Sequence, residues 1–352
     1  MQSPPTQPSP TPLSRRQEVI LRLIVHEYVA SGRPVGSKAL GERHQVGVSA
    51  ATIRNEMADL EAGGYIQHRH TSGGRVPTDQ GYRYFVHHLL GEVELPSSER
   101  IMIRHQFRQV EVQLEQWVEL AATVLAHAAG NVSLVTAPRT ATTRFRHLEL
   151  ISLQPRLGLL ILVTADSAVR QLMVHWPEDT EQEALSALAD TMSIALRGMT
   201  AAEVAAHVPG EGKLARFVLD QLIVALRGQD AAERTAIRHS GLEHILMQPE
   251  FSGAVDETQA FLGMLRGGAF LNALLPSLTA GREDVQVFIG EENPTSELRR
   301  LGVVISTYGI DGEITGIVGV VGPTRMPYGR TISSVRYVSH LMSNLMADLY
   351  GA

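Results

Sequence analysis

Apolar and polar residues alternate most regularly in the first 90 residues of the chain. Apolar positions recur there at helical spacing, and serines stand where helices would begin. Pro34 prevents the first helical segment from continuing, and Gly63 and Gly64 end the third. The Thr-Ser-Gly-Gly turn at 71–74 joins two short strands. The pattern predicts a hairpin and four helices, the helices covering residues 14–31, 37–43, 49–62 and 79–90.

A longer helical stripe follows this region. Seven apolar residues recur at alternating steps of four and three, namely Ile103, Phe107, Val110, Leu114, Trp117, Ala121 and Val124. Such a stripe is the heptad seam of a coiled coil, and it predicts one long linker helix within residues 93–130. The seam can pack onto its own domain or against a second copy of the chain, and the sequence leaves both open.

The rest of the chain changes from strands to helices and back to strands. Three strand-like runs precede a helix at 184–196, and they cover residues 148–153, 157–164 and 169–175. Strands return before a final helix at 332–349, and they cover residues 285–289, 302–308 and 313–321. Between them, residues 200–275 are Ala-rich and helical. We expect an α+β multidomain chain, with an α/β domain in two parts, 131–199 and 276–352, around a mostly helical insertion at 200–275.

Composition narrows the class of protein. The chain has 352 residues, 44% hydrophobic and 19% charged, which suits a globular protein of two or three domains. Residues 1–12 contain five prolines and no charge, which predicts a disordered tail. The absence of cysteine excludes disulfides and thiolate metal sites. Neither a signal-peptide pattern nor a membrane-spanning apolar run is found, so we expect a cytoplasmic protein without a membrane partner.

Charge is distributed unevenly along the chain. The net charge is −6, but residues 13–91 carry ten Lys and Arg against seven Asp and Glu, or +3. The remainder must then carry −9, since −6 − 3 = −9. A basic N-terminal segment, predicted to span 13–92, on an acidic body suits a protein that reads DNA with one end only.

The third predicted helix has residue types suited to reading bases. Ile53, Met57 and Leu60 recur at i, i+4 and i+7 and should face the core. The opposite side, near the N-terminus of the helix, then carries Ser49, Ala51, Thr52, Arg54 and Asn55. Arg can grip guanine, Asn can bond adenine, and small or methyl-bearing side chains can touch thymine. The same residues could also form the solvated face of an ordinary amphipathic helix.

The hairpin that follows favours the DNA interpretation. Its tip presents hydrogen-bond donors suited to phosphate oxygens or a narrow minor groove, from Arg69, His70, Ser72 and Arg75. A helix followed by a basic hairpin is the arrangement of a winged helix-turn-helix. His68 and His70 could form a metal pair, but no further ligand cluster supports one, and we expect no metal.

No catalytic or cofactor motif is found. The chain lacks a G-x-x-x-x-G-K-[ST] phosphate loop, an H-E-x-x-H pair and a G-x-S-x-G elbow. Gly316, Gly319 and Gly322 lack the dinucleotide-binding spacing, and such glycines in a strand favour close packing. Arg325, in Gly-Pro-Thr-Arg-Met-Pro-Tyr, could bind an anion in an effector pocket, or could make an internal salt bridge. We predict neither catalytic residues nor a cofactor.

Several long segments resemble one protein family. RQEVILRLIVHEYVASGRPVGSKAL, VSAATIRNEMADLE and HTSGGRVPTDQGYRYFV are similar to stretches of the heat-inducible transcription repressor family (HrcA). The likeness continues in QPEF at 248–251, IGEEN at 289–293 and GPTRMPYGR at 322–330. The usual wing of that family has Ser-Ala-Gly where this chain has Ser72-Gly73-Gly74, a small departure that should leave the turn intact.

The resemblance implies a fold and a function. It implies a winged helix-turn-helix, a GAF-like α/β domain and a dimerisation domain inserted into the latter. It implies a nucleoid-associated homodimer that binds an inverted-repeat operator of chaperone operons and depends on a GroE-type chaperonin to stay folded and active. Heat-damaged protein would occupy that chaperonin and so release the operons. The alternative is a small-molecule-gated winged-helix regulator with its effector site in the GAF-like domain.

Overall fold

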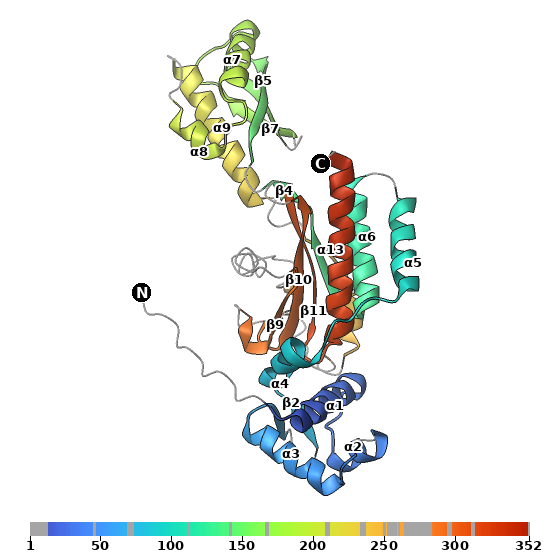
Figure 1. The fold of residues 1–352 in the computed structure, drawn as a ribbon. Helices are drawn as coiled ribbons and strands as arrows, with labels where there is room; N and C mark the ends of the chain where they lie inside the picture. The colour runs from blue at the N-terminus through green and yellow to red at the C-terminus, as the bar shows by residue number, and fades with distance from the viewer. Residues whose placement is uncertain are drawn as a thin grey trace.

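The fold combines helices with several β-sheets, arranged as three units along an elongated molecule (Figure 1). The computed structural model describes residues 13–44, 47–68, 74–110, 113–140, 143–165, 169–207, 212–232, 237–248, 251, 259, 261–263, 284–293, 298–310 and 314–350. The predicted tail at 1–12 lies outside these residues. Among the helices of this part of the chain, none is long and apolar enough to cross a membrane.

The N-terminal unit has the predicted order of helices and hairpin. Its elements are α1 (Arg15–Ser31), α2 (Ser37–Arg43), α3 (Ala50–Ala62), β1 (Ile66–His68), β2 (Arg75–Pro77), α4 (Asp79–Tyr84) and the π-helical turn η1 (Phe85–Leu89). Ser14 and Gln17 form a capping box that starts α1, and Gly32 ends it at a φ of 65°. The N-cap of α2 is Gly36 and not Ser37, which is the first residue of the helix and is buried.

The predicted long linker helix is two helices. The chain leaves the helical conformation between α5 (Ser97–Gln109) and α6 (Leu114–Ala129), because Val110 and Gln113 have extended backbones. This break lets α5 lie beside α6 (Figure 1). Five of the seven seam residues are buried and the other two, Val110 and Leu114, are half-buried. The seam therefore packs inside its own chain and is not available to a second copy.

The central unit is a six-stranded antiparallel sheet in the order β8-β3-β11-β10-β9, with β4 paired to β11. Its strands are β3 (Val132–Thr136), β4 (Arg139–Thr140), β8 (Ile237–Ser240), β9 (Gln286–Ile289), β10 (Leu301–Ile310) and β11 (Ile314–Pro323). Helices α6 and α13 (Tyr328–Tyr350) cover one face, and α10 (Leu242–Leu246) packs on the other. Short strands β3 and β8 were not predicted, and β8 lies in the segment expected to be helical.

The glycines of β11 have the expected packing role. A Cβ on Gly316 would lie 2.4 Å from the ring of Tyr308, its cross-strand partner on β10. The Tyr308 ring fills that space, and its hydroxyl donates to the carbonyl oxygen of Thr136 at 2.6 Å. Glycine is required here for the close approach of an aromatic side chain.

The third unit, which we call the distal unit, has a sheet of its own. Strands β5 (Phe145–Gln154), β6 (Leu157–Thr164) and β7 (Val169–His175) pair in that order and share a core with α7 (Gln182–Ala195), α8 (Ala201–Ala206) and α9 (Lys213–Ala232). The sequence pattern predicted these strands as part of the α/β domain, with the insertion beginning at residue 200. That boundary cuts through one packed unit, because the strands bury their inner face against the helices that follow them.

Candidate nucleic-acid interface

Helix α3 turns its apolar side inward, as predicted. Ile53, Met57 and Leu60 are fully buried in the core of the N-terminal unit. The opposite side is exposed at Ala51, Arg54 and Asn55, while Thr52 is half-buried. The predicted reading residues of α3 therefore lie on one outward surface near its N-terminus.

The N-terminus of α3 is capped and carries no negative charge. The hydroxyl oxygen of Ser49 accepts a hydrogen bond from the Thr52 amide at 3.2 Å, and the two hydroxyls lie 3.0 Å apart. The first turn holds no acidic residue. The positive end of the helix dipole is therefore free to face an anion such as a phosphate group.

The exposed face of α3 is unusual in its small side chains. Exposed surfaces of helices are mostly Lys, Glu and other long polar residues, whereas this one is lined by Ala50, Ala51, Ala58 and Ala62. Arg54 and Asn55 stand out from it and make no hydrogen bond or ion pair with the residues that the structure describes. A groove floor could approach this face closely, and the two polar side chains would then reach base edges.

Ion pairs brace α3 and α2 against α1. Arg16 on α1 contacts Glu56 on α3 at 3.1 Å. Glu27 on α1 receives Arg43 at 2.6 Å and His44 at 3.0 Å. Each of these carboxylates is thus matched by a cation.

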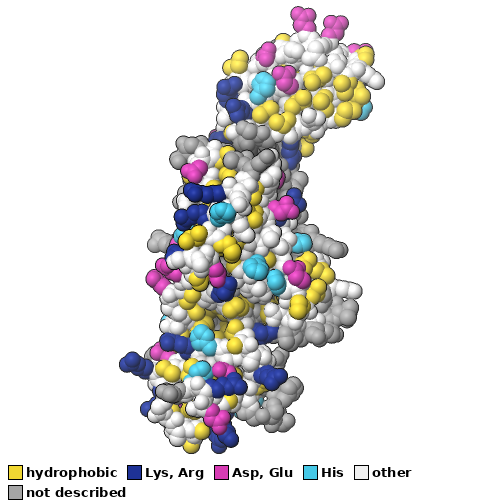
Figure 2. Space-filling model, turned by 90° about the vertical axis from the view of Figure 1, so that its right-hand side faces the viewer, with side chains coloured by type: hydrophobic (Ala, Val, Ile, Leu, Met, Phe, Trp, Pro, Cys, Tyr) yellow, Lys and Arg dark blue, Asp and Glu magenta, His cyan; other side chains and the backbone are white. Residues whose placement is uncertain are grey.

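Lys38 is a cation that the sequence analysis did not single out. Its side chain is 84% exposed and lies 3.8 Å from Glu42 on the same helix. Its place in the first turn of α2, the helix before α3, was the available signal. Arg54 and Lys38 are thus exposed cations on the outer surface of the unit. Figure 2 shows Lys and Arg side chains gathered on this end of the molecule.

The hairpin pairs β1 with β2 in antiparallel register, from Ile66 opposite Pro77 to His68 opposite Arg75. Val35, before α2, also pairs with Arg75 through two backbone hydrogen bonds of 2.8 and 2.9 Å. Three of the predicted tip residues, Arg69, His70 and Ser72, lie outside the described residues. Of the predicted hairpin donors, the structure thus describes Arg75 alone.

Arg75 is engaged inside the unit. Its guanidinium contacts the Glu61 carboxylate of α3 at 3.0 and 3.1 Å, and its side chain is only 12% exposed. The Nδ1 atom of His68 bonds the other oxygen of the same carboxylate. Burial raises the pKa of the Glu61 carboxyl, but the hydrogen bonds from His68 and Arg75 outweigh it and hold that pKa below its ordinary value. Glu61 therefore fastens both strands of the hairpin to α3.

Two substitutions separate a bracing role of Arg75 from direct contact with phosphate. A phosphate donor would flatten the log–log salt dependence of DNA binding by about 0.9 when replaced by alanine. We expect Arg75→Ala instead to destabilise the N-terminal unit by about 1 kcal/mol, with the salt slope unchanged, in thermal unfolding and fluorescence anisotropy.

Glu61→Gln is the matched control because it frees the Arg75 cation. If Arg75 contacts phosphate directly, this variant should bind DNA as well as wild type or better. If it braces the hairpin, both variants should bind more weakly. The stabilisation by the pair should be present above the ordinary pKa of Glu61 and be lost as the pH falls through its lowered folded-state value.

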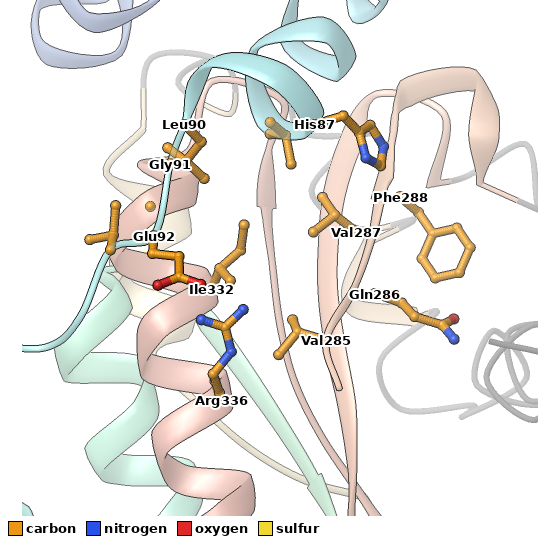
Figure 3. Close-up of a pocket in the computed structure, with 13 residues that line it drawn as sticks. His87, Leu90, Gly91, Glu92, Val285, Gln286, Val287, Phe288, Ile332 and Arg336 are labelled. Atoms are coloured by element: carbon orange, nitrogen blue, oxygen red, sulfur yellow. The ribbon is translucent and has the colours of Figure 1, made fainter. Parts of the chain in front are cut away.

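Within the described residues, no group of three or more His, Asp or Glu could hold a metal ion. Arg325 is engaged inside the chain, donating to the Val29 carbonyl oxygen at 3.4 Å and to the Gln248 side chain at 2.5 Å. A pocket of about 360 Å³ lies between η1, β9 and α13 (Figure 3). Arg325 is not among its lining residues; Arg336, Glu92 and His87 are.

Comparison with known proteins gives consistent results. Residues 115–332 match the family model described as "HrcA protein C terminal domain". The chain is 45% identical to the heat-inducible transcription repressor HrcA of Thermomicrobium roseum, covering 96% of this chain and 97% of that protein. It is 41% identical to the protein of the same name from Herpetosiphon aurantiacus, again covering 96% and 97%. Among solved structures, that of a hypothetical protein is similar, with 23% identity, a TM-score of 0.57 and coverage of 96% and 98%.

Proposed function

Because the chain belongs to the HrcA family of heat-inducible transcription repressors, we propose that its N-terminal unit is a winged helix-turn-helix that binds the operator. The chain is a transcription repressor of heat-shock genes and not an enzyme. The observation that carries the proposal is the outward surface of α3, where Arg54 and Asn55 stand among alanines and have no hydrogen-bond or ion-pair partner among the described residues. Bases would be read by Arg54, Asn55 and Thr52, with Ser49 and Ala51 beside them.

The hairpin and α2 would hold the unit on the DNA backbone. Lys38 supplies an exposed cation next to α3. Arg69, His70 and Ser72 at the hairpin tip remain proposed backbone contacts, on the grounds of sequence. Arg75 fixes the hairpin to α3 and acts through its position. Such contacts orient a protein on a duplex without selecting a sequence.

We propose that the repressor binds an inverted repeat as a homodimer through the distal unit. One recognition helix reads only a few base pairs, whereas a twofold dimer reads two half-sites. The outer face of the β5-β6-β7 sheet offers the surface, because many of its side chains are apolar and exposed to solvent (Figure 2). Exposed on it are Ile151, Leu153, Val169 and Met173, beside half-buried Leu159, Ile161 and Val163. The central unit would be the GAF-like domain, continued on both sides of this insertion.

Release on heat stress would follow loss of chaperonin-assisted folding. A GroE-type chaperonin is the proposed partner, since uncovered apolar surface such as the outer face of the distal sheet becomes a liability when the dimer dissociates. Chaperonin occupied by heat-damaged protein would leave the repressor inactive. The protein would act at the nucleoid, where its operator lies.

A gel mobility shift tests the proposal. Purified protein is mixed with a duplex holding the inverted repeat of a chaperonin-operon promoter, with and without GroE-type chaperonin, over a range of temperature. We expect the repeat to shift and a scrambled duplex not to shift, with chaperonin extending binding to higher temperature. Equal binding to both duplexes would contradict operator recognition. Loss of binding at the same temperature with chaperonin would instead indicate direct heat sensing.

The pocket in Figure 3 favours a second candidate function, effector gating. Arg336 faces it from α13 and makes no ion pair within 4 Å with a described residue. Valine, leucine and isoleucine side chains line much of the remainder, beside Glu92, His87 and Gln286, and we propose a small organic anion with an apolar body, held by Arg336, as the ligand. Calorimetry with benzoate as the probe distinguishes the candidates. If the wild type gives a heat of binding and Arg336→Ala does not, the result supports gating. If the wild type gives no heat of binding, chaperonin control is the function that remains.

A further inference from the structure

Two of the quoted segments take no direct part in DNA reading or in dimerisation. These are residues 289–293 (Ile-Gly-Glu-Glu-Asn) and 322–330 (Gly-Pro-Thr-Arg-Met-Pro-Tyr-Gly-Arg). Both lie in the central unit, and both contact the N-terminal unit where the two units meet. Their contacts define a joint between the DNA-reading end and the body of the molecule.

The first contact of the joint is between Asp79 and Gly290. The carboxylate of Asp79, in the first turn of α4, accepts a hydrogen bond from the Glu291 amide at 3.3 Å. Gly290 has a φ of 57°, and a Cβ there would lie 1.7 Å from the Asp79 carboxylate. Only glycine therefore permits this approach, for reasons of both backbone conformation and space.

A second contact lies one helical turn further along α4. The guanidinium of Arg83 forms an ion pair with the carboxylate of Glu292. The other oxygen of that carboxylate accepts the Ile289 amide at 2.9 Å, so the acid is held by its own loop. Asn293, which is buried, closes the loop by donating from its side chain to the carbonyl oxygens of Gly290 and Leu298 at 2.9 and 3.0 Å. The loop is thus held in shape by hydrogen bonds within the central unit, independently of its contacts with α4.

The second segment supports the joint from the opposite side. Tyr328 is fully buried against Tyr82 of α4, with ring centroids 5.9 Å apart. Arg325 donates to the Val29 carbonyl oxygen in the last turn of α1, next to Gly32. A cation at the C-terminus of a helix is favourable.

Helix α4 is in turn fixed to α3. The Thr78 hydroxyl donates to the Gly64 carbonyl oxygen at 2.6 Å, and the Gln80 side chain donates to that of Gly63 at 3.2 Å. Gly81 lies against the backbone of Tyr65, where a Cβ would meet the carbonyl oxygen at 2.0 Å. A shift of α4 in the joint must therefore move the reading helix with it.

We propose that residues 289–293 are a positioning element for operator binding. By holding Asp79 and Arg83 they set the angle of α3 relative to the body of the repressor, and hence the spacing of the two reading helices in a dimer. The N-terminal and distal units lie at opposite ends of the molecule (Figure 1), so a small rotation at the joint displaces α3 relative to its copy. The inference rests on the proposed dimeric operator binding.

Charge exchange across the joint tests this role in the full-length protein. Affinities of Arg83→Glu, Glu292→Arg and the double variant are measured by anisotropy on the inverted repeat, on one half-site, and on repeats with the half-site spacing changed by one or two base pairs. We expect each single variant to lose about tenfold to a hundredfold on the repeat and less than about twofold on the half-site. The double variant should regain part of the lost affinity because it restores the opposite charges, while the Ile289 amide still lacks its carboxylate acceptor.

Gly290→Ala should have the same effect as the single charge variants, and Gly130→Ala is its control. Gly130 also has a positive φ, 63°, but its Cβ would meet nothing within 4 Å. Equal losses on the repeat and the half-site, or full affinity in the single variants, would overturn the proposal. A wild-type protein that does not prefer the repeat over a half-site would instead contradict the proposed function.

A distance measurement tests the joint without DNA. The chain has no cysteine, so one pair of spin labels can be attached to two introduced cysteines, Glu42→Cys on α2 and Met102→Cys on α5. The side chain of Glu42 is 66% exposed and Met102 is 51% exposed. We expect a narrow distance distribution in wild type, a broader or shifted one in Arg83→Glu and Gly290→Ala, and recovery in the double charge variant. An unchanged distribution in all of them would overturn the positioning role.

Discussion

Replacing Arg54 by alanine is expected to cause a large and sequence-selective loss of operator binding. A bidentate contact to a base is worth about 1–3 kcal/mol. In a dimer the contact occurs once in each half-site, so the loss on an inverted repeat is roughly 30-fold to 20,000-fold. Asn55→Ala should act in the same way. The loss should be nearly absent on non-specific duplex, because neither side chain is needed for backbone attraction.

Fluorescence anisotropy on cognate and scrambled duplexes measures the affinity for the operator and the affinity for non-specific DNA. Ala58→Ser is a suitable control, because it changes the same exposed face of α3 further from its N-terminus. Thermal unfolding should be unchanged in Arg54→Ala, since the side chain has no partner among the described residues. If Arg54→Ala and Asn55→Ala both bind the repeat as wild type does, the reading surface lies elsewhere.

The periodicity of α3 was sufficient to predict which of its side chains face the core and which face outward. Three buried positions at helical spacing fix the direction of every other side chain on the helix, and the serine cap fixes where the helix begins. The prediction could not extend to Arg75. Its partner Glu61 is 14 residues away along the chain, and only the folded hairpin brings the two together.

Apolar patterns also predicted where strands lie along the chain, but not which strands pair with one another. The residues of β6 alternate between half-buried and buried, yet both faces are apolar, so the run resembles a strand buried on both sides. Nothing in that run tells which sheet it joins. Likewise the heptad seam continues past Val110 and Gln113, whose backbones are extended. Apolar periodicity predicts which residues will be buried, but it does not show whether the helix that carries them is interrupted.

The outer face of the distal sheet is where a single substitution should have the largest effect on assembly. Apart from Glu149 and Gln171, which flank Ile161, the central positions of this face are aliphatic or methionine, and register places Leu159 between Ile151 and Met173. A stable interface buries about 800 Å² on each partner, with an apolar centre. Met173→Glu would place a charge in that centre without touching the core on the other face, because Met173 is 64% exposed.

We expect Met173→Glu to convert the dimer to a monomer in analytical ultracentrifugation and to weaken binding to the inverted repeat by about 10² to 10⁴, because the second half-site loses its effective concentration. Half-site affinity should be unchanged. Ile194→Glu is the matched control, since Ile194 is 81% exposed on α7, which packs against the inner face of the sheet. A dimer that survives Met173→Glu and Ile161→Lys would place the interface elsewhere. Deleting residues 200–275 cannot answer this question, because it removes α8 and α9 from the core that supports the same sheet.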